Sequence, residues 1–178
     1  KNFASSIKTF LRENHIIILE STTYPGTTRE FFLPVLENCG FRPGKDAFLI
    51  YSPEREDPGN KKYKIKNIPK IVSGYSDNCK KIGSLIYGKV AKKTVEVKSL
   101  EHAEMVKLYE NIYRSINIGL ANEMKIVCEK MSLNIFEVIK AASTKPFGFS
   151  PFYPGPGYGG HCIQIDPFYL SWKSQQFG

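Results

Sequence analysis

A cysteine that follows a glycine-rich segment is the strongest candidate for chemistry in this sequence. Residues 155–160 read Gly-Pro-Gly-Tyr-Gly-Gly, and Cys162 stands two positions after them. Glycines let the backbone approach a ligand closely and present its N–H groups. A helix predicted to begin near Asp166, with Pro167 in its first turn, would favour the nucleophilic thiolate. We therefore predict that Cys162 is a nucleophile with Asp166 within reach. The alternative is a free cysteine in a loop that packs on a core.

A second candidate group lies on one face of a long predicted helix. Lys107, Asn111 and Arg114 are spaced i, i+4 and i+7, so a helix places them on one side. Cation and amide donors side by side suit an anionic ligand or a developing oxyanion. A solvated helix face is the alternative, although the apolar residues around these positions indicate a partly buried helix.

Two further candidates stand directly after predicted strands. Thr22 follows the apolar run 15–20, and Glu54 follows the apolar run 47–51. Ligands of open α/β sheets bind at the carboxyl ends of the strands, so these two side chains could meet at one site. The alternatives are a helix cap or turn residue for Thr22 and a surface carboxylate for Glu54. For His161 we favour a structural role, because neighbours on an extended chain point apart.

The elements that must position these residues change character near the middle of the chain. Residues 1–99 alternate strand and helix patterns, which indicates the C-terminal part of a Rossmann-like α/β domain with a parallel sheet. Its strands are predicted at 15–20, 47–51, 70–73 and 94–97, and its helices at 27–39 and 77–90. Residues 100–178 are predicted to form an all-α middle domain, with helices at 101–131, 133–142 and from 166 onward.

A phosphate-binding turn is missing where a dinucleotide fold would carry it. No G-x-G-x-x-G pattern follows the opening helix or the first strand. We therefore expect the sequence to begin inside such a fold and to be a fragment, with its helical domain truncated.

Composition excludes several classes of protein. The 178 residues are 42% hydrophobic and 24% charged, which is typical of a globular chain. No apolar run is long enough to span a membrane, and the first residues lack a signal sequence. The net charge of +8 is scattered, and no aromatic-basic motif suggests nucleic acid. The basic cluster at 61–66 indicates a solvated loop, or charge that serves a phosphorylated substrate. The four cysteines form no Cys-x-x-Cys pair, so we expect no metal and a reducing, cytoplasmic location.

Four ordered motifs resemble the UDP-glucose/GDP-mannose dehydrogenase family over nearly the whole chain. They are Glu-Ser-Thr-Thr-Tyr-Pro-Gly-Thr-Thr at 20–28, Ser-Pro-Glu-Arg with Asp-Pro-Gly-Asn at 52–60, Lys-Leu-Tyr-Glu-Asn at 107–111, and Gly-Gly-His-Cys at 159–162 followed by Asp166. Residues 145–157 are most similar to the bacterial UDP-N-acetylglucosamine 6-dehydrogenase branch. Gln164 stands where the family usually has proline, and we expect this to change loop stiffness but not activity.

The resemblance implies an NAD-dependent oxidation of the C6 alcohol of a UDP-sugar to the uronic acid, through a thioester on Cys162. Lys107 and Asn111 would stabilise the oxyanion. Asp166 and Thr22 would hold the alcohol or water and help to deprotonate it. Glu54 would be the base for thioester hydrolysis.

Binding roles also follow from the resemblance. Tyr153 and the backbone of 155–160, Gly159 included, would cradle the nucleotide sugar, and Thr22 and Cys162 would also face NAD. Arg114 is added to the substrate contacts from helix spacing alone. A homodimer through the long helix is implied as well. The alternative is a truncated, non-catalytic dimerisation module, and we expect the isolated chain to be inactive.

Overall fold

The structure is a computed structural model that describes residues 6–57, 60, 62–157 and 165–178. The chain divides into two compact units. The first comprises residues up to Leu108 together with Tyr169–Gly178, and the second comprises Tyr109–Phe168. The long helix α4 (Leu100–Lys130) begins in the first unit and continues into the second.

The first unit is built on a four-stranded sheet with strand order β1-β2-β3-β4. The strands are β1 (His15–Leu19), β2 (Ala47–Tyr51), β3 (Lys70–Gly74) and β4 (Thr94–Glu96). β1 pairs with β2 and β3 pairs with β4 in parallel, as the sequence predicts, but β2 and β3 run antiparallel. Parallel neighbours need a crossover, which a helix usually provides. Helices connect the two parallel pairs, whereas β2 and β3 are joined by a loop that holds only the short 3₁₀ turn η3 (Ile65–Asn67).

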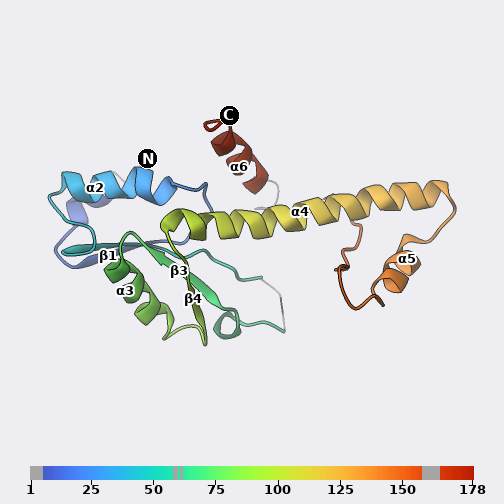
Figure 1. Cartoon of the computed structure of the whole chain (residues 1–178), viewed down its shortest axis with the longest axis horizontal. Coiled ribbons are helices and arrows are strands. Elements are labelled where there is room, and N and C mark those ends of the chain that lie inside the picture. Colours follow the sequence, from blue (N-terminus) through green and yellow to red (C-terminus); the bar gives the residue numbers. More distant parts are fainter. Residues whose placement is uncertain (1–5, 58–59, 61, 158–164) are drawn as a thin grey trace. The chain divides into compact units, whose positions relative to one another are not determined.

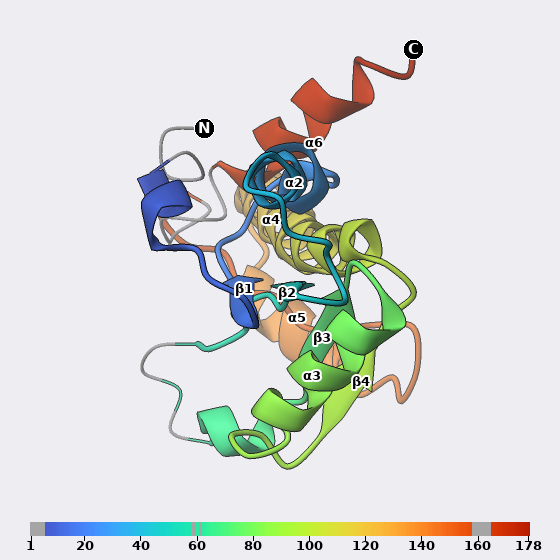
Figure 2. The ribbon, with the colours of Figure 1, turned by 90° about the vertical axis from the view of Figure 1, so that its left-hand side faces the viewer.

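Helices cover both faces of this sheet, as Figures 1 and 2 show. The 3₁₀ turn η1 (Ile7–Phe10) precedes β1, and the π-helical turn η2 (Thr28–Phe32) and α2 (Leu33–Asn38) follow it. α3 (Asp77–Tyr87) connects β3 to β4 on the opposite face. The α/β class predicted from the strand and helix rhythm is therefore confirmed.

Strand alternation divides the core of the first unit into two clusters. Leu49 and Tyr51 of β2 face α2 and the first turns of α4, where they pack with Leu36 and Leu100. Their neighbour Ile50 faces α3 and packs with buried residues of β3 and α3. Successive side chains of a strand point to opposite faces, so β2 is buried on both sides. This double burial fixes the strand whose end carries Glu54.

The second unit consists of the later turns of α4, the helix α5 (Ile135–Ala142) and the first residues of α6 (Asp166–Ser174). Asn134 caps α5 by accepting a hydrogen bond from the backbone N–H of Phe136 at 3.0 Å. Cys128, Ile135 and Ile139 form a small buried core. Across the described ranges, no helix combines the length and the apolar character that crossing a membrane requires.

Candidate functional site

The predicted site residues are distributed over both units. Thr22, Glu54 and Lys107 lie in the first unit. The second unit holds the other described candidates, which are Asn111, Arg114, Tyr153 and Asp166. Cys162, Gly159 and His161 lie outside the described residues.

A buried amide–carboxylate pair stands in the second unit. Asn111 on α4 donates a hydrogen bond from Nδ2 to Oδ2 of Asp166 at 2.5 Å. Asn111 is 6% exposed and Asp166, the first residue of α6, is 2% exposed. A carboxylate so deeply buried needs donors to offset its desolvation. The amide therefore fixes the orientation of a carboxylate that stands four residues after Cys162, and its nitrogen carries a second N–H for a ligand.

Lys107 is half-buried on α4, four residues before Asn111. No hydrogen bond or ion pair with the described residues engages its ammonium group. Because α4 is continuous over Leu100–Lys130, the i, i+4 spacing of Lys107 and Asn111 gives them one helix face. The long helix that the sequence predicts around these two residues is therefore present.

Thr22 is half-buried in the loop that follows β1. The next helical turn begins at Thr28 and has Thr27 at its cap position, so the alternative of Thr22 as a helix cap is wrong. The loop is internally bonded, since Thr27 Oγ1 lies 2.5 Å from Thr23 Oγ1 and 2.8 Å from the carbonyl of Tyr24. Tyr24 also packs on Trp172 of α6, with ring centroids 4.9 Å apart.

Glu54 belongs to an ionic cluster at the end of β2. Its Oε2 accepts from Lys70 at 3.0 Å, and its Oε1 accepts from the backbone N–H groups of Arg55 and Glu56 at 2.7 Å each. Burial raises the pKa of the Glu54 carboxyl, but the Lys70 and backbone hydrogen bonds outweigh it, so the pKa lies below its ordinary value. Lys70 also lies 3.3 Å from Glu20.

A cavity of about 290 Å³ adjoins this cluster. Glu20, Glu54, Lys70 and Tyr87 supply polar groups to its lining, and Tyr87 donates to Glu20 at 2.7 Å. Burial and the neighbouring Glu20 raise the pKa of Tyr87, so the phenol remains a donor. Glu54 is thus exposed, as the surface-carboxylate alternative expects, and it also forms an ion pair with Lys70.

The two remaining candidates are more exposed. Arg114 is exposed on α4 and forms no hydrogen bond or ion pair with the described residues. Tyr153 is exposed as well, and its ring stacks on Phe136 of α5 with centroids 6.5 Å apart. Both side chains are open to solvent, and neither belongs to the Asn111–Asp166 pair.

Two residues that the sequence does not single out organise the candidate loops. Glu104 is fully buried on α4 and accepts hydrogen bonds from the loop that carries Thr22. Asn122 holds the start of the glycine-rich segment, accepting from the N–H of Gly155 at 2.9 Å and donating to the carbonyl of Gly157 at 3.3 Å. Glu104 could have been found from the sequence, because it is a charged residue between apolar neighbours on a predicted helix. Nothing in the local sequence distinguishes Asn122.

Comparison with known proteins places both parts of the chain in one family. Residues 1–91 match the NAD binding domain of the UDP-glucose/GDP-mannose dehydrogenase family, and residues 101–178 match its central domain. The UDP-N-acetyl-D-glucosamine 6-dehydrogenase of Pseudomonas aeruginosa is 41% identical over 98% of this chain and 42% of the relative. Protein CapL of Staphylococcus aureus is 43% identical over 92% of this chain and 38% of the relative. The chain thus spans about two fifths of the curated relatives' length.

Solved structures agree with these matches. The UDP-D-ManNAc dehydrogenase from Pyrococcus horikoshii superimposes with a TM-score of 0.90 at 30% identity, covering 98% of this chain and 41% of that one. The UDP-N-acetyl-mannosamine dehydrogenase Cap5O from Staphylococcus aureus gives a TM-score of 0.82 at 38% identity, covering 97% and 41%.

Proposed function

Because the chain belongs to the UDP-glucose/GDP-mannose dehydrogenase family, we propose that it forms part of an NAD-dependent enzyme that oxidises the C6 alcohol of a UDP-sugar to the uronic acid. UDP-N-acetylglucosamine or a close relative is the proposed substrate, since three of the four proteins named above are dehydrogenases of N-acetylated UDP-sugars by their names. The observation that carries the proposal is the buried Asn111–Asp166 hydrogen bond. Burial of a fixed carboxylate costs stability, and a site for proton transfer explains its retention.

Each step of the reaction has a residue for it. Asp166 and Thr22 hold the C6 hydroxyl and help remove its proton as the alcohol becomes an aldehyde. The Cys162 thiolate then forms a C–S bond to the aldehyde carbon. The aldehyde oxygen becomes an oxyanion, which Lys107 and Asn111 stabilise.

Loss of a second hydride from C6 leaves a thioester. Glu54 takes a proton from water, which attacks the carbonyl carbon and releases the carboxylate and the free thiol. Its ion pair with Lys70 supports this role, because a base must be ionised to accept a proton.

The cofactor requirement fits the first unit in part. The carboxyl ends of the parallel strands β1 and β2 carry the Thr22 loop and Glu54, which is where dinucleotide folds bind their ligand. NAD, when bound, accepts one hydride in each oxidation. We propose that Thr22 and Cys162 contact it, that Tyr153 and Gly159 contact the sugar nucleotide, and that Arg114 pairs with its phosphates.

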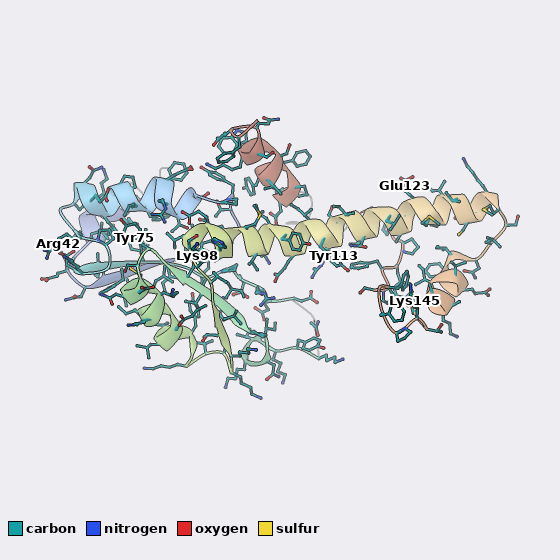
Figure 3. All side chains as sticks on the ribbon, in the orientation of Figure 1. Arg42, Tyr75, Lys98, Tyr113, Glu123 and Lys145 are labelled. Carbon is teal, nitrogen blue, oxygen red and sulfur yellow. The ribbon has the colours of Figure 1, made fainter. Side chains whose placement is uncertain are left out.

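We further propose a domain boundary between residues 99 and 100 and a homodimer formed through α4. The two matched family domains, 1–91 and 101–178, support the boundary. Apolar side chains exposed along α4 support the dimer, because they recur every three or four residues; Figure 3 labels one of them, Tyr113. They are Tyr109, Tyr113, Ile116, Leu120, Met124, Val127 and Met131. A monomeric molar mass by light scattering would contradict the dimer.

A reducing, cytoplasmic location is proposed from the cysteines. Cys39, Cys79 and Cys128 are free thiols in the described part of the chain. Free thiols persist where glutathione and thioredoxin keep them reduced.

The nucleophile is tested by comparing thiols. We expect Cys162 to react with iodoacetamide faster than the other three cysteines of the folded complete gene product. Cys79 and Cys128 are buried and Cys39 is half-buried. Solvent exposure alone therefore predicts that Cys39 reacts second fastest. Mass spectrometry of limited alkylation gives the ranking, and Cys162→Ser is the control that removes the fast site. Faster labelling of Cys39 than of Cys162 would make the assignment wrong.

The Glu54–Lys70 pair predicts a change in pH dependence. Lys70→Met removes the cation that helps to keep the pKa of Glu54 below its ordinary value, so that pKa rises. A base acts only when ionised. As the solution is acidified, the variant therefore loses activity at a higher pH than the unchanged protein does. The acidic limb of the turnover–pH profile is expected to move to higher pH. Lys80→Met, which removes an ion pair with Asp77 on α3, should leave the limb in place. An unmoved limb in Lys70→Met would exclude Glu54 as the base.

A further inference from the structure

A buried carboxylate on α4 receives three hydrogen bonds from one distant loop. Oε2 of Glu104 accepts from the backbone N–H of Gly26 at 2.5 Å. Its Oε1 accepts from the backbone N–H of Thr28 at 2.8 Å and from the Thr28 hydroxyl at 2.6 Å. Glu104 and Thr28 are both fully buried. None of the reaction steps above uses this carboxylate.

The donors lie where the loop after β1 turns into η2 (Thr28–Phe32). Backbone N–H groups at the start of a helix lack partners within the helix and attract negative charge. Gly26 has a φ of 105°, a conformation that side chains disfavour. The turn therefore depends on glycine for its shape and on Glu104 for its buried donors.

Thr22 lies in the same loop, four residues before Gly26. Hydrogen bonds among Thr23, Tyr24 and Thr27 close it on itself, so fixing its end at Gly26 and Thr28 also limits its earlier residues. Glu104 precedes Lys107 by three residues on the same helix. One carboxylate thus connects the loop that carries Thr22 to the helix that carries Lys107, entirely within the first unit.

We propose that Glu104 is a positioning residue that fixes the position of Thr22 relative to Lys107, so that both act on the same carbon of the sugar nucleotide. The inference rests on the proposed function, since it assigns Glu104 a role only through Thr22. Its physical basis is that reacting groups must be held within a fraction of an ångström, and that a misplacement of about 1 Å costs roughly a hundredfold in rate.

The charge of Glu104 suits this role. Burial raises the pKa of its carboxyl, and the hydrogen bonds from Thr28 and Gly26 act in the opposite direction. A carboxylate offers two acceptor oxygens to the three donors, whereas a glutamine offers one oxygen and a nitrogen that donates. Glu104→Gln therefore keeps the volume but sets a donor against the N–H of Gly26 or of Thr28.

A matched control lies one turn earlier on α4. Glu101, which is half-buried, pairs with the exposed Arg29 of η2 at 2.6 Å, so it also joins the helix to this segment, but through a side chain and not through the loop backbone. Glu101→Gln removes a connection of similar span without disturbing the donors of Gly26 and Thr28. Exposed ion pairs contribute little to stability, so its turnover should change by less than about twofold.

The experiment measures turnover of Glu104→Gln, Thr22→Ala and the double variant in the complete gene product. We expect Glu104→Gln to lower kcat by roughly tenfold or more, with a smaller change in KM. In the Thr22→Ala background the same substitution should cost less than about twofold, because coupled residues act non-additively. Hydrogen exchange should accelerate in residues 22–28 and not in β2. Thr28→Val, which removes one of the three donors, should change kcat in the same direction by less, and it substitutes for Glu104→Gln if that variant does not fold.

Two outcomes separate the inference from the proposed function. If Thr22→Ala lowers kcat and Glu104→Gln adds its full effect in the double variant, the positioning role is wrong and the function stands. If Thr22→Ala leaves kcat unchanged, the role assigned to Thr22 is wrong and the inference fails with it. Faster exchange in the loop with an unchanged kcat would reduce Glu104 to a structural residue.

Discussion

Lys107→Ala in the complete gene product is expected to lower turnover with UDP-N-acetylglucosamine by about a hundredfold to a thousandfold, the usual cost of losing one oxyanion donor. In the proposed mechanism, formation of the thiohemiacetal and hydrolysis of the thioester both place negative charge on the C6 oxygen, whereas the bound alcohol is neutral. A cation beside this oxygen therefore stabilises the transition state more than the ground state, and kcat falls more than KM rises. The half-buried position of Lys107 strengthens the effect, because partial exclusion of water enhances the interaction of charges.

Steady-state rates of NADH formation give both constants. Lys125→Ala is the matched control, since it removes a lysine from the same helix that pairs with Glu129 at the surface, and its kcat should change by less than about twofold. Normal kcat in Lys107→Ala, with only a higher KM, would mean that the lysine binds the substrate and does not stabilise the oxyanion.

The sequence predicts the elements of the fold better than their connections. Ala47–Tyr51 forms the predicted strand with the predicted limits, because its apolar residues are bounded by Gly44 and Pro53. The long helix is predicted at 101–131 and found at Leu100–Lys130. The antiparallel pairing of β2 and β3 is not predicted, because periodicity identifies a strand without giving its direction.

The segment after β1 differs from its prediction for a local reason. A single helix is predicted at 27–39, but the structure has the π-helical turn Thr28–Phe32 followed by α2 at Leu33–Asn38. Pro34 has no N–H and cannot donate to the carbonyl one turn earlier, which disfavours regular α-helix before it. The predicted end at Cys39 lies one residue beyond the observed end at Asn38, and Gly40, the predicted stop, adopts a φ of 82°.

The candidate site could be predicted only where its residues form local patterns. Lys107 and Asn111 are four residues apart, so a helix places them on one face, and this spacing can be read from the sequence. The partnership of Asn111 with Asp166 spans 55 residues, and that of Glu104 with Gly26 spans 78. Tertiary packing alone creates these contacts, so they cannot be predicted from a local sequence pattern.

Residues 1–178 expressed alone are expected to form no detectable NADH from UDP-N-acetylglucosamine or UDP-glucose, although they include Cys162. Hydride transfer requires the nicotinamide ring to be held in near-contact with C6. Dinucleotide folds hold the pyrophosphate with a glycine-rich turn after a strand and with the N-terminus of the following helix. In this sequence β1 is followed by Glu-Ser-Thr-Thr-Tyr-Pro-Gly and not by such a turn. Without such an anchor, cofactor binding should be weaker on the order of a thousandfold or more.

The measurement must distinguish a polypeptide that is folded but inactive from one that is unfolded. In the described sheet β1 is an edge strand, and Ile16 on it is 43% exposed, which favours association between copies. Circular dichroism and size-exclusion chromatography should therefore first confirm a folded, dispersed polypeptide. The complete gene product, assayed at the same concentration, provides the positive control. NADH formation by residues 1–178 that disappears in Cys162→Ser would contradict the prediction, because it would mean that these residues bind the cofactor productively without a glycine-rich turn after β1.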